Sequence, residues 1–525
     1  MAHAHAARMG VLLAGALGAA VLLHPAAARA DEAACHTLTA PGLFKDTRIA
    51  SAEMVGAAGP PGGVAYCEVK GVMSPVAGSH IGVVFRLPET WNGRVLGIGG
   101  GGWQGNVTLQ AAEPGLARGY ATLQTNGGHD VPTGLADARA AAFDNSWAKD
   151  NPEGVKDFAW RAVHLTSVIG KDVAARYYGK PLQLAVFQGC STGGRMALME
   201  AHRFPDDYNA IVAGAPVFNL QVQTAGLVKG RLFTTAKTGL TDGQIKTINT
   251  AVLDACDALD GLKDGIVTDP RACRWDPSAI QCKPGEAASD ACLTSEQAGA
   301  VRRAYADVRG ADGKIVVYGL ARSGEAGWSV FVATRPRPPA PAAPNPLNAY
   351  IYGDANYNEA SFDPAKDTAR VRSTAFAKDY ESDDPDIRPF LGKGGKLLLW
   401  HGYDDPGPSP FATTAYYEAV KRTAGAGAAV RLFLAPGVYH CGGGPGANKF
   451  DTLAAMDGWI ASNTAPEVIP ASNPQLGFTR PLCAWPALAF YRGSGDPKDA
   501  ASFACRAASP ARTASAEAKA GVAAR

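Results

Sequence analysis

The sequence has 525 residues, of which 46% are hydrophobic, so it is long enough to form more than one folded unit. Its 50 lysines and arginines balance 48 acidic residues, and the formal net charge is +2. This near-neutral balance lacks the long basic patches that nucleic-acid binding requires, so we expect no nucleic-acid partner and favour a small-molecule or neutral polymer substrate.

The first thirty residues are typical of an export signal. Arg8 precedes an apolar run over residues 9–23, and a small-x-small sequence at residues 28–30 ends directly before Asp31. The apolar run is shorter than the roughly 20 residues that cross a bilayer, and no later stretch of the sequence matches it. We therefore expect residues 1–30 to be cleaved, and we expect a secreted or periplasmic protein without a membrane anchor.

Short apolar runs rich in β-branched residues alternate with longer helical patterns through residues 31–217 and again through residues 390–505. This alternation predicts an α/β fold with a mainly parallel sheet covered by helices. The expected strands are residues 81–87, 95–98, 120–125, 182–187, 210–212, 396–400 and 430–434. Apolar side chains at three- and four-residue steps over residues 155–173 predict a crossover helix.

The alternating pattern stops after Pro216, so we expect a second unit inserted at residues 218–389. This stretch contains an acidic loop, four cysteines and a proline-rich run at residues 335–346, whose composition favours extended backbone. The last stretch, residues 506–525, is rich in alanine and scattered charges, and we expect a disordered tail there.

The sequence Gly189-Cys190-Ser191-Thr192-Gly193 matches the G-x-S-x-G pattern of a nucleophile elbow. It follows an expected strand and precedes a helix-forming run, which is the context that this pattern needs. The glycines are required because the strained turn that exposes the serine leaves no room for a Cβ on either side. An α/β-hydrolase core with Ser191 as nucleophile is therefore favoured over an ordinary glycine turn.

A serine hydroxyl needs a base oriented by an acid, and in this fold the acid and then the histidine follow the serine along the chain. The expected strand at 396–400 runs into Asp404 and Asp405, and the strand at 430–434 is followed by His440. We predict His440 as the base. Asp404 and Asp405 both remain candidates for the acid, because the local sequence does not separate them.

The charge that develops on the substrate oxygen needs backbone donors. Thr192, directly after the nucleophile, supplies one, and a run of four glycines at 99–102 lets the backbone approach a substrate closely. We favour Gly101 or Gly102 for the second donor. A phosphate-binding loop is the alternative, but the spacing is not G-x-x-x-x-G-K-[ST] and no ribose-binding acid follows at the right distance.

All ten cysteines follow the expected signal, and an even number in an exported chain predicts a full set of disulfides. No two cysteines form a CxxC pair, which argues against zinc ribbons. Cys190 adjoins Ser191 and Cys441 adjoins His440, so a bridge between them would tie the base to the nucleophile. The alternative is that each of these cysteines pairs elsewhere.

Three motifs, Cys190-Ser191, the stretch His401-Gly402-Tyr403-Asp404-Asp405 and His440-Cys441, together resemble the tannase and feruloyl esterase family, which includes mono(hydroxyethyl) terephthalate hydrolases. The resemblance covers nearly all of the mature chain. It implies that Asp405, the fifth residue of its stretch, is the acid, and that Cys190 pairs with Cys441. The other pairs that it implies are Cys35–Cys67, Cys256–Cys273, Cys282–Cys292 and Cys483–Cys505.

The resemblance also implies that the inserted unit is a lid that covers the site and carries a structural Ca²⁺ ion. The ligands would be the carboxylates of Asp257, Asp260 and Asp264 and the backbone carbonyls of Leu262 and Ile266. Hard oxygen ligands at such close steps suit calcium, but the bidentate glutamate of an EF-hand is missing and a solvated acidic loop is the alternative. We expect no organic cofactor.

We therefore expect a secreted serine carboxylic-ester hydrolase that forms an acyl-enzyme on Ser191. The resemblance favours small esters of aromatic acids, with hydroxycinnamates first, gallates second and a terephthalate half-ester third. Candidates for stacking on the substrate ring are Trp328, Phe331, Tyr350 and Tyr352, and Arg322 is a candidate for binding a substrate carboxylate, although each also suits a structural role. The alternatives are a peptidase and an inactive binding module on the same fold.

Overall fold

The computed structural model describes residues 32–57, 63–130, 138–220, 228–336, 345–425, 427 and 429–508. The expected export signal, much of the proline-rich run and most of the expected tail lie outside these residues. Strand β16 (Phe503–Ala507) pairs Arg506 with Leu488, so regular structure continues two residues past the boundary expected at residue 505. Within the described ranges, no helix is long and apolar enough to cross a bilayer.

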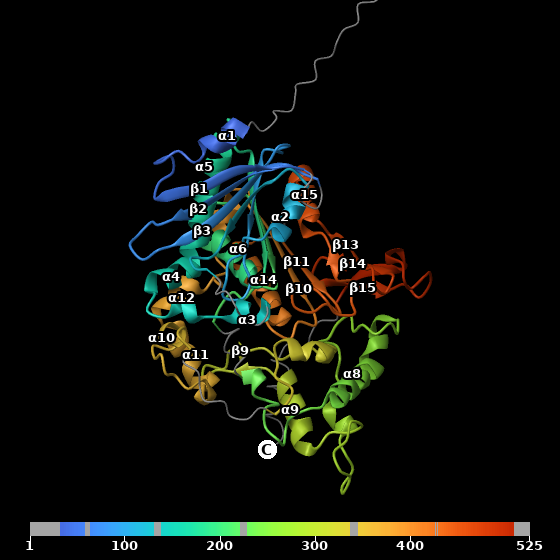
Figure 1. Ribbon diagram of the computed structural model, residues 1–525. Coiled ribbons are helices and arrows are strands. Elements are labelled where there is room, and N and C mark those ends of the chain that lie inside the picture. Colours follow the sequence, from blue (N-terminus) through green and yellow to red (C-terminus); the bar gives the residue numbers. More distant parts are fainter. Residues whose placement is uncertain are drawn as a thin grey trace, which may run out of the picture.

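A nine-stranded mixed sheet forms the centre of the molecule, in the order β1-β2-β3-β5-β4-β6-β7-β10-β11 (Figure 1). Neighbours from β5 to β11 run parallel, whereas β1, β2, β3 and β5 pair antiparallel. The strands are β1 (Thr47–Val55), β2 (Tyr66–Met73), β3 (Ile81–Pro88), β4 (Arg94–Ile98), β5 (Ala121–Thr125), β6 (Leu184–Cys190), β7 (Ala210–Gly214), β10 (Lys396–Gly402) and β11 (Val430–Ala435). The sequence patterns predicted every parallel strand of this sheet but not β1 or β2. The edge strand β1 has only two buried positions, so it lacks a regular apolar pattern.

Both faces of the sheet are covered, as the alternation along β10 shows. Leu397 and Leu399 belong to one apolar core, and Leu398 and Trp400 belong to the other. Helices α5 (Ala162–Tyr178), α6 (Thr192–Arg203) and α14 (Pro410–Ala424) contribute to the first core, and α2 (Leu109–Leu116) and α15 (Thr452–Ser462) contribute to the second. A sheet buried on both sides leaves the loops at its strand ends as the place for a site.

The expected crossover helix at residues 155–173 is not a single regular helix. It consists of α4 (Pro152–Lys156), a π-helical segment (Asp157–Arg161) and α5. A wide π turn frees backbone carbonyls from the usual ladder. The guanidinium of Arg195, fully buried on α6, donates to two of these, with Nη2 3.0 Å from Phe158 O and Nη1 2.5 Å from Ala159 O.

Residues 218–389 are called the insert, and the part of them that the structure describes adds no strand to the main sheet. Their described part has its own apolar cluster, which includes Phe233, Ile248 and Trp328. In Figure 1 helices α8, α9 and α11 lie at one end of the molecule and strands β1 to β3 at the other. The insert contains α8 (Asp242–Cys256), α9 (Ser295–Tyr305), β8 (Val308–Arg309), β9 (Ile315–Val317), α10 (Asn348–Ile351), α11 (Pro364–Arg372) and α12 (Ala375–Tyr380), and α13 (Arg388–Gly392) begins at its end.

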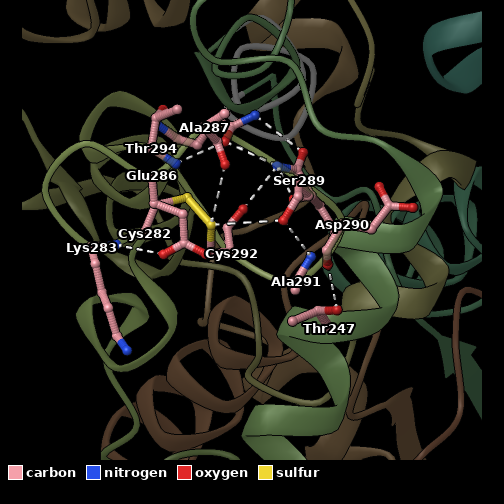
Figure 2. The surroundings of a disulfide bond; sticks show 12 residues. Thr247, Cys282, Lys283, Glu286, Ala287, Ser289, Asp290, Ala291, Cys292 and Thr294 are labelled. Carbon is pink, nitrogen blue, oxygen red and sulfur yellow. Dashed lines mark hydrogen bonds between the residues drawn. A yellow bond between two sulfur atoms is a disulfide. The ribbon is translucent and has the colours of Figure 1, made fainter.

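The structure contains the five disulfides that the family resemblance implied. Figure 2 shows Cys282–Cys292 in the insert, where Thr247 of α8 donates a hydrogen bond to the backbone of Asp290. Cys483–Cys505 joins the two small sheets at the end of the chain.

The remaining α-helices and strands of the described residues are α1 (Glu32–Thr37), α3 (Ala138–Phe143), β12 (Lys449–Phe450), β13 (Val468–Asn473), β14 (Phe478–Cys483) and β15 (Ala487–Tyr491).

Candidate active site

Ser191 lies on a sharp turn between β6 and α6. Its φ of 64° and ψ of −124° are a strained combination for a residue other than glycine. The turn is held by Ser191 N, which donates to Gly214 O at 3.0 Å. A Cβ on Gly189 would lie 2.5 Å from the backbone of Gly193, so the glycine spacing of the motif is a requirement of close packing. The nucleophile elbow predicted from the sequence is present.

His440 and Asp405 meet at the ends of the adjacent strands β11 and β10. His440 Nδ1 lies 2.7 Å from Asp405 Oδ2, and the side chain of Asp405 is fully buried. Burial alone would raise the pKa of this carboxyl, but the imidazoles of His440 and His401 lower it to about 2. Asp405 is therefore an anion that accepts a hydrogen bond from Nδ1–H. This arrangement lets Nε2 of His440 act as a base.

His401 is a second partner of Asp405, a role that was not predicted from the sequence. Its Nε2 lies 3.1 Å from Asp405 Oδ2 and 3.0 Å from the carbonyl of Pro408, and its Nδ1 lies 2.8 Å from the hydroxyl of Thr413. Since both neighbours of Nε2 are acceptors, this nitrogen carries the proton. His401 lies at the end of β10, four residues before Asp405, and this position in the sequence was the signal that could have identified it.

The structure separates the two candidate acids. Asp404 has its partner in the insert: its carboxyl accepts a hydrogen bond from the hydroxyl of Ser323, which lies 3.0 Å from each oxygen. Asp405 in contrast pairs with His440 and also accepts a bond from Gly407 N at 2.8 Å. The geometry therefore agrees with the choice that the resemblance implied.

Ser191 and His440 line one cavity of about 1390 Å³. The Cys190–Cys441 disulfide, with 6.0 Å between its Cα atoms, joins the residue before the serine to the residue after the histidine. The two predicted reaction partners are thus brought to the same wall although 251 residues separate the cysteines.

The glycine run lies against the elbow in the same cavity. Gly101, Gly102 and Thr192 all line it, and the hydroxyl of Thr192 donates to Gly102 O at 2.5 Å. Gly193 N donates to Gly100 O at 2.8 Å, which fixes the loop to the start of α6. The arrangement places the backbone of Gly101 and Gly102 beside Ser191, and it does not select one of the two glycines.

The insert covers part of this cavity, and its aromatic candidates separate into two groups. Phe331 and Tyr352 line the cavity, and the ring of Phe331 meets the ring of His440 edge-on at 5.0 Å. Trp328 is fully buried in the insert and stacks on Phe233, and half-buried Tyr350 packs against the main core. Neither is part of the cavity lining.

Arg322, the candidate for binding a substrate carboxylate, does not reach the cavity. Its Nε donates to the carbonyl of Trp275 at 3.0 Å, and its guanidinium lies over the ring of Tyr305, 4.6 Å from the centroid. The side chain is half-buried in the insert. These contacts give Arg322 the structural role that the sequence also allowed.

The acidic loop expected to bind calcium lies outside the cavity. Asp257 and Asp260 are buried, and their oxygens accept hydrogen bonds from the loop itself, such as Gly265 N to Asp257 at 2.9 Å and Leu262 N to Asp260 at 2.9 Å. Asp264 pairs with Arg480 at 2.6 Å. Burial and mutual repulsion raise the pKa of Asp260, so a cation beside these three carboxylates would relieve unfavourable charge.

Comparison with known proteins agrees with this geometry. The sequence profile described as "Tannase and feruloyl esterase" matches residues 67–506. The chain is 31% identical to a mono(2-hydroxyethyl) terephthalate hydrolase of Piscinibacter sakaiensis, over 84% of this chain and 85% of that protein, and 31% identical to a probable feruloyl esterase of Arthroderma benhamiae, over 81% and 82%.

Solved structures give the same result. Feruloyl esterase B from Aspergillus oryzae superposes with a TM-score of 0.80 at 26% identity, covering 90% of this chain and all of that one. A tannin acyl hydrolase from Aspergillus niger shares the fold with a TM-score of 0.69 at 21% identity, covering 91% and 95%. The α/β-hydrolase core expected from the elbow is confirmed. The chain therefore belongs to the tannase and feruloyl esterase family and is a carboxylic ester hydrolase.

Proposed function

We propose that this esterase hydrolyses esters of aromatic acids, with hydroxycinnamate esters first, and that Ser191, His440 and Asp405 carry out the reaction. The observation that carries the proposal is a single cavity with Ser191 and His440 on its wall and aromatic side chains around it. Those aromatic residues are Trp103, Phe143, Phe218, Tyr318, Phe331, Tyr352 and Tyr416. Such a lining suits a planar phenolic ring, which aromatic side chains bind by stacking and edge contacts.

In the proposed reaction the Oγ of Ser191 attacks the ester carbonyl while Nε2 of His440 takes the proton from this hydroxyl. Thr192 N and the N–H of Gly101 or Gly102 stabilise the oxyanion. The tetrahedral intermediate collapses, the C–O bond to the alcohol breaks, and His440 returns the proton to the leaving oxygen. Water then hydrolyses the acyl-enzyme with His440 again as base, while buried Asp405 stabilises the imidazolium at each stage.

Charge in the cavity supports an acyl group without a free carboxylate. Asp130 and Glu359 line the cavity and are bonded to the neutral amides of Asn126 and Asn345, at 3.0 Å each. Lys229 carries the only ammonium group among the described residues that line the cavity. This group already donates hydrogen bonds to three backbone carbonyls at 2.6 to 3.1 Å. We therefore place hydroxycinnamates and gallates before a terephthalate half-ester.

A panel of methyl ferulate, methyl gallate and a terephthalate half-ester tests the substrate order. We expect the highest kcat/KM with methyl ferulate and the lowest with the half-ester. A highest value with the half-ester would contradict the charge argument. The matched amide of ferulic acid tests the peptidase alternative, and labelling of Ser191 by an organophosphorus probe tests the inactive binding module, which predicts no adduct.

We further propose that Asp257, Asp260 and Asp264, with the carbonyls of Leu262 and Ile266, hold a structural Ca²⁺ ion. Two buried carboxylates and a third that is paired with Arg480 form a set of hard oxygen donors with an excess of negative charge. The ion would stabilise the insert and take no part in the chemistry. Export with cleavage of residues 1–30 also belongs to the proposal, and five disulfides support an oxidising compartment.

A further inference from the structure

We propose that Ser323 and Asp404 form a clasp between the insert and the loop of the acid, and that this clasp positions the Asp405–His440 pair. The proposal rests on the proposed function, because it concerns the same three reacting groups. Ser323 and Asp404 are assigned as positioning residues, since neither lines the cavity.

The clasp is a direct and buried contact. The hydroxyl of Ser323 lies 3.0 Å from both carboxyl oxygens of Asp404, and the two residues are only 5% and 2% exposed. Asp404 N in turn donates to Val438 O at 3.1 Å, two residues before His440. Ser323 of the insert is thus bonded to Asp404. Asp404 precedes Asp405 in the chain, and its backbone is bonded to the loop of His440.

The backbone of the insert is held in an unusual conformation to make this contact. Ser323 has a φ of 92°, which residues with a side chain rarely adopt. Buried Glu325 fixes it by accepting Ser323 N at 3.0 Å, and Glu325 itself accepts bonds from Tyr305 at 2.7 Å and Asn249 at 2.9 Å. Strained residues persist only where the surroundings over-determine them, and they cluster at functional sites.

The same segment also contacts the histidine loop. A Cβ on Gly327 would lie 2.9 Å from the ring of Tyr439, so the segment packs flat against the residue before His440. Phe331 then meets the His440 ring edge-on at 5.0 Å. Residues 323–331 of the insert therefore contact the loops of both the acid and the base, with the hydroxyl of Ser323 as the polar link.

Ionisation provides a way to disturb the clasp. Burial raises the pKa of Asp404 well above its usual range, helped by the nearby Glu325, whose pKa is also raised by burial. Tyr439 from the histidine loop faces both carboxyls, and burial and their charges raise its pKa to about 12. Asp405 is the adjacent anion in the chain. When pH rises and Asp404 and Glu325 lose their protons, repulsion between them weakens the clasp.

The test compares Ser323→Ala and Ser323→Gly with Thr247→Ala. Thr247 also makes a side-chain hydrogen bond within the insert, next to Cys282–Cys292 and outside the cavity lining (Figure 2). Both Ser323 variants should lower kcat about 10- to 100-fold with KM changed less than about 3-fold, because misplacement of catalytic groups by about 1 Å has effects of this size. Glycine relieves the strained φ, so wild-type kcat in Ser323→Gly overturns the clasp.

Asp404→Asn and Asp404→Ala test the carboxyl. Asparagine keeps the shape of the neutral side chain, so it should restore most of the kcat that alanine loses and shift the alkaline decline of kcat to higher pH. Equal kcat and equal pH profiles in wild type, asparagine and alanine variants overturn the proposal. If neither Asp404 variant folds, the Ser323 pair decides.

The rate of Ser191 labelling by an organophosphorus probe separates the two proposals. Labelling requires the nucleophile and base but no aromatic ester. If the wild type is labelled yet hydrolyses none of the aromatic esters, the proposed substrate is wrong, and the clasp is still tested by slower labelling of the Ser323 variants. Labelling at the wild-type rate in those variants overturns the clasp.

Discussion

Removal of the Cys190–Cys441 disulfide, by changing both cysteines to alanine, tests whether this bridge holds the proposed base beside the nucleophile. The bridge closes a loop of 251 residues, whereas Cys282–Cys292 closes one of 10 (Figure 2). By the chain-entropy relation the two closures contribute about 5.5 and about 2.7 kcal/mol to stability at 25 °C. The second disulfide, removed in the same way, is the control because neither of its cysteines lines the cavity.

Two measurements distinguish a local effect from a general one. Urea unfolding should show that the free energy of unfolding falls by about 5.5 kcal/mol in the first variant and about 2.7 kcal/mol in the control. Steady-state kinetics with methyl ferulate, under conditions in which each variant is folded, should show kcat lowered about 100-fold in the first variant, because the loops of Ser191 and His440 are no longer tied. The control should keep the wild-type kcat.

A variant that lacks the bridge, as verified by mass spectrometry, and still turns over methyl ferulate at the wild-type kcat would show that the bridge does not position the base. A control variant that loses as much kcat as the first would also contradict this positioning role, because the loss would then follow stability and not the position of the bridge. Full activity of the wild type after verified reduction of Cys190 would lead to the same conclusion.

Three further changes have defined outcomes. Asp405→Asn should lower kcat by about 10³- to 10⁴-fold with little change in KM, because the imidazolium loses its buried counter-charge; a loss of less than 10-fold in steady-state assays contradicts the role. The pKa of Asp405 is lowered to about 2 from about 4 in an unfolded chain, so its stabilising contribution is complete above about pH 4 and is lost as pH falls toward 2. In urea unfolding from pH 5 to pH 2, the difference in free energy of unfolding between wild type and Asp405→Asn should therefore shrink. A difference that stays constant over this pH range contradicts the prediction. Removal of calcium by a chelator should lower the melting temperature with little change in kcat, because the proposed ion binds the folded state away from the cavity; an unchanged melting temperature in a sample shown to be metal-free removes the ion from the account.

Some features of the site were accessible from the sequence because they depend on short stretches of chain. The elbow is a local turn whose glycine spacing follows from backbone clashes, and it could be predicted from residues 189–193 alone. The loops of Asp405 and His440 could be placed because the carboxyl ends of parallel strands meet at one edge of a sheet. The calcium loop is also a local pattern, and it stays a prediction.

Other features depend on contacts between distant parts of the chain. Local sequence could not separate Asp404 from Asp405, because the difference lies in their partners, Ser323 in the insert and His440 after β11. Trp328 and Phe331 are close neighbours in the sequence, yet only Phe331 lines the cavity. The π-helical turn before α5 was likewise invisible, since its carbonyls are satisfied by Arg195 from another helix.

The chemical groups that this protein offers can be read along the chain: a serine on a strained turn, a histidine and acids at strand ends, and an even set of cysteines. Which aspartate orients the histidine, which aromatic rings line the cavity and how the insert contacts the reacting groups became known from the folded structure. The physical reason is that covalent geometry and local sterics act over a few residues, whereas burial, hydrogen-bond partners and charge environment arise only when distant segments pack together.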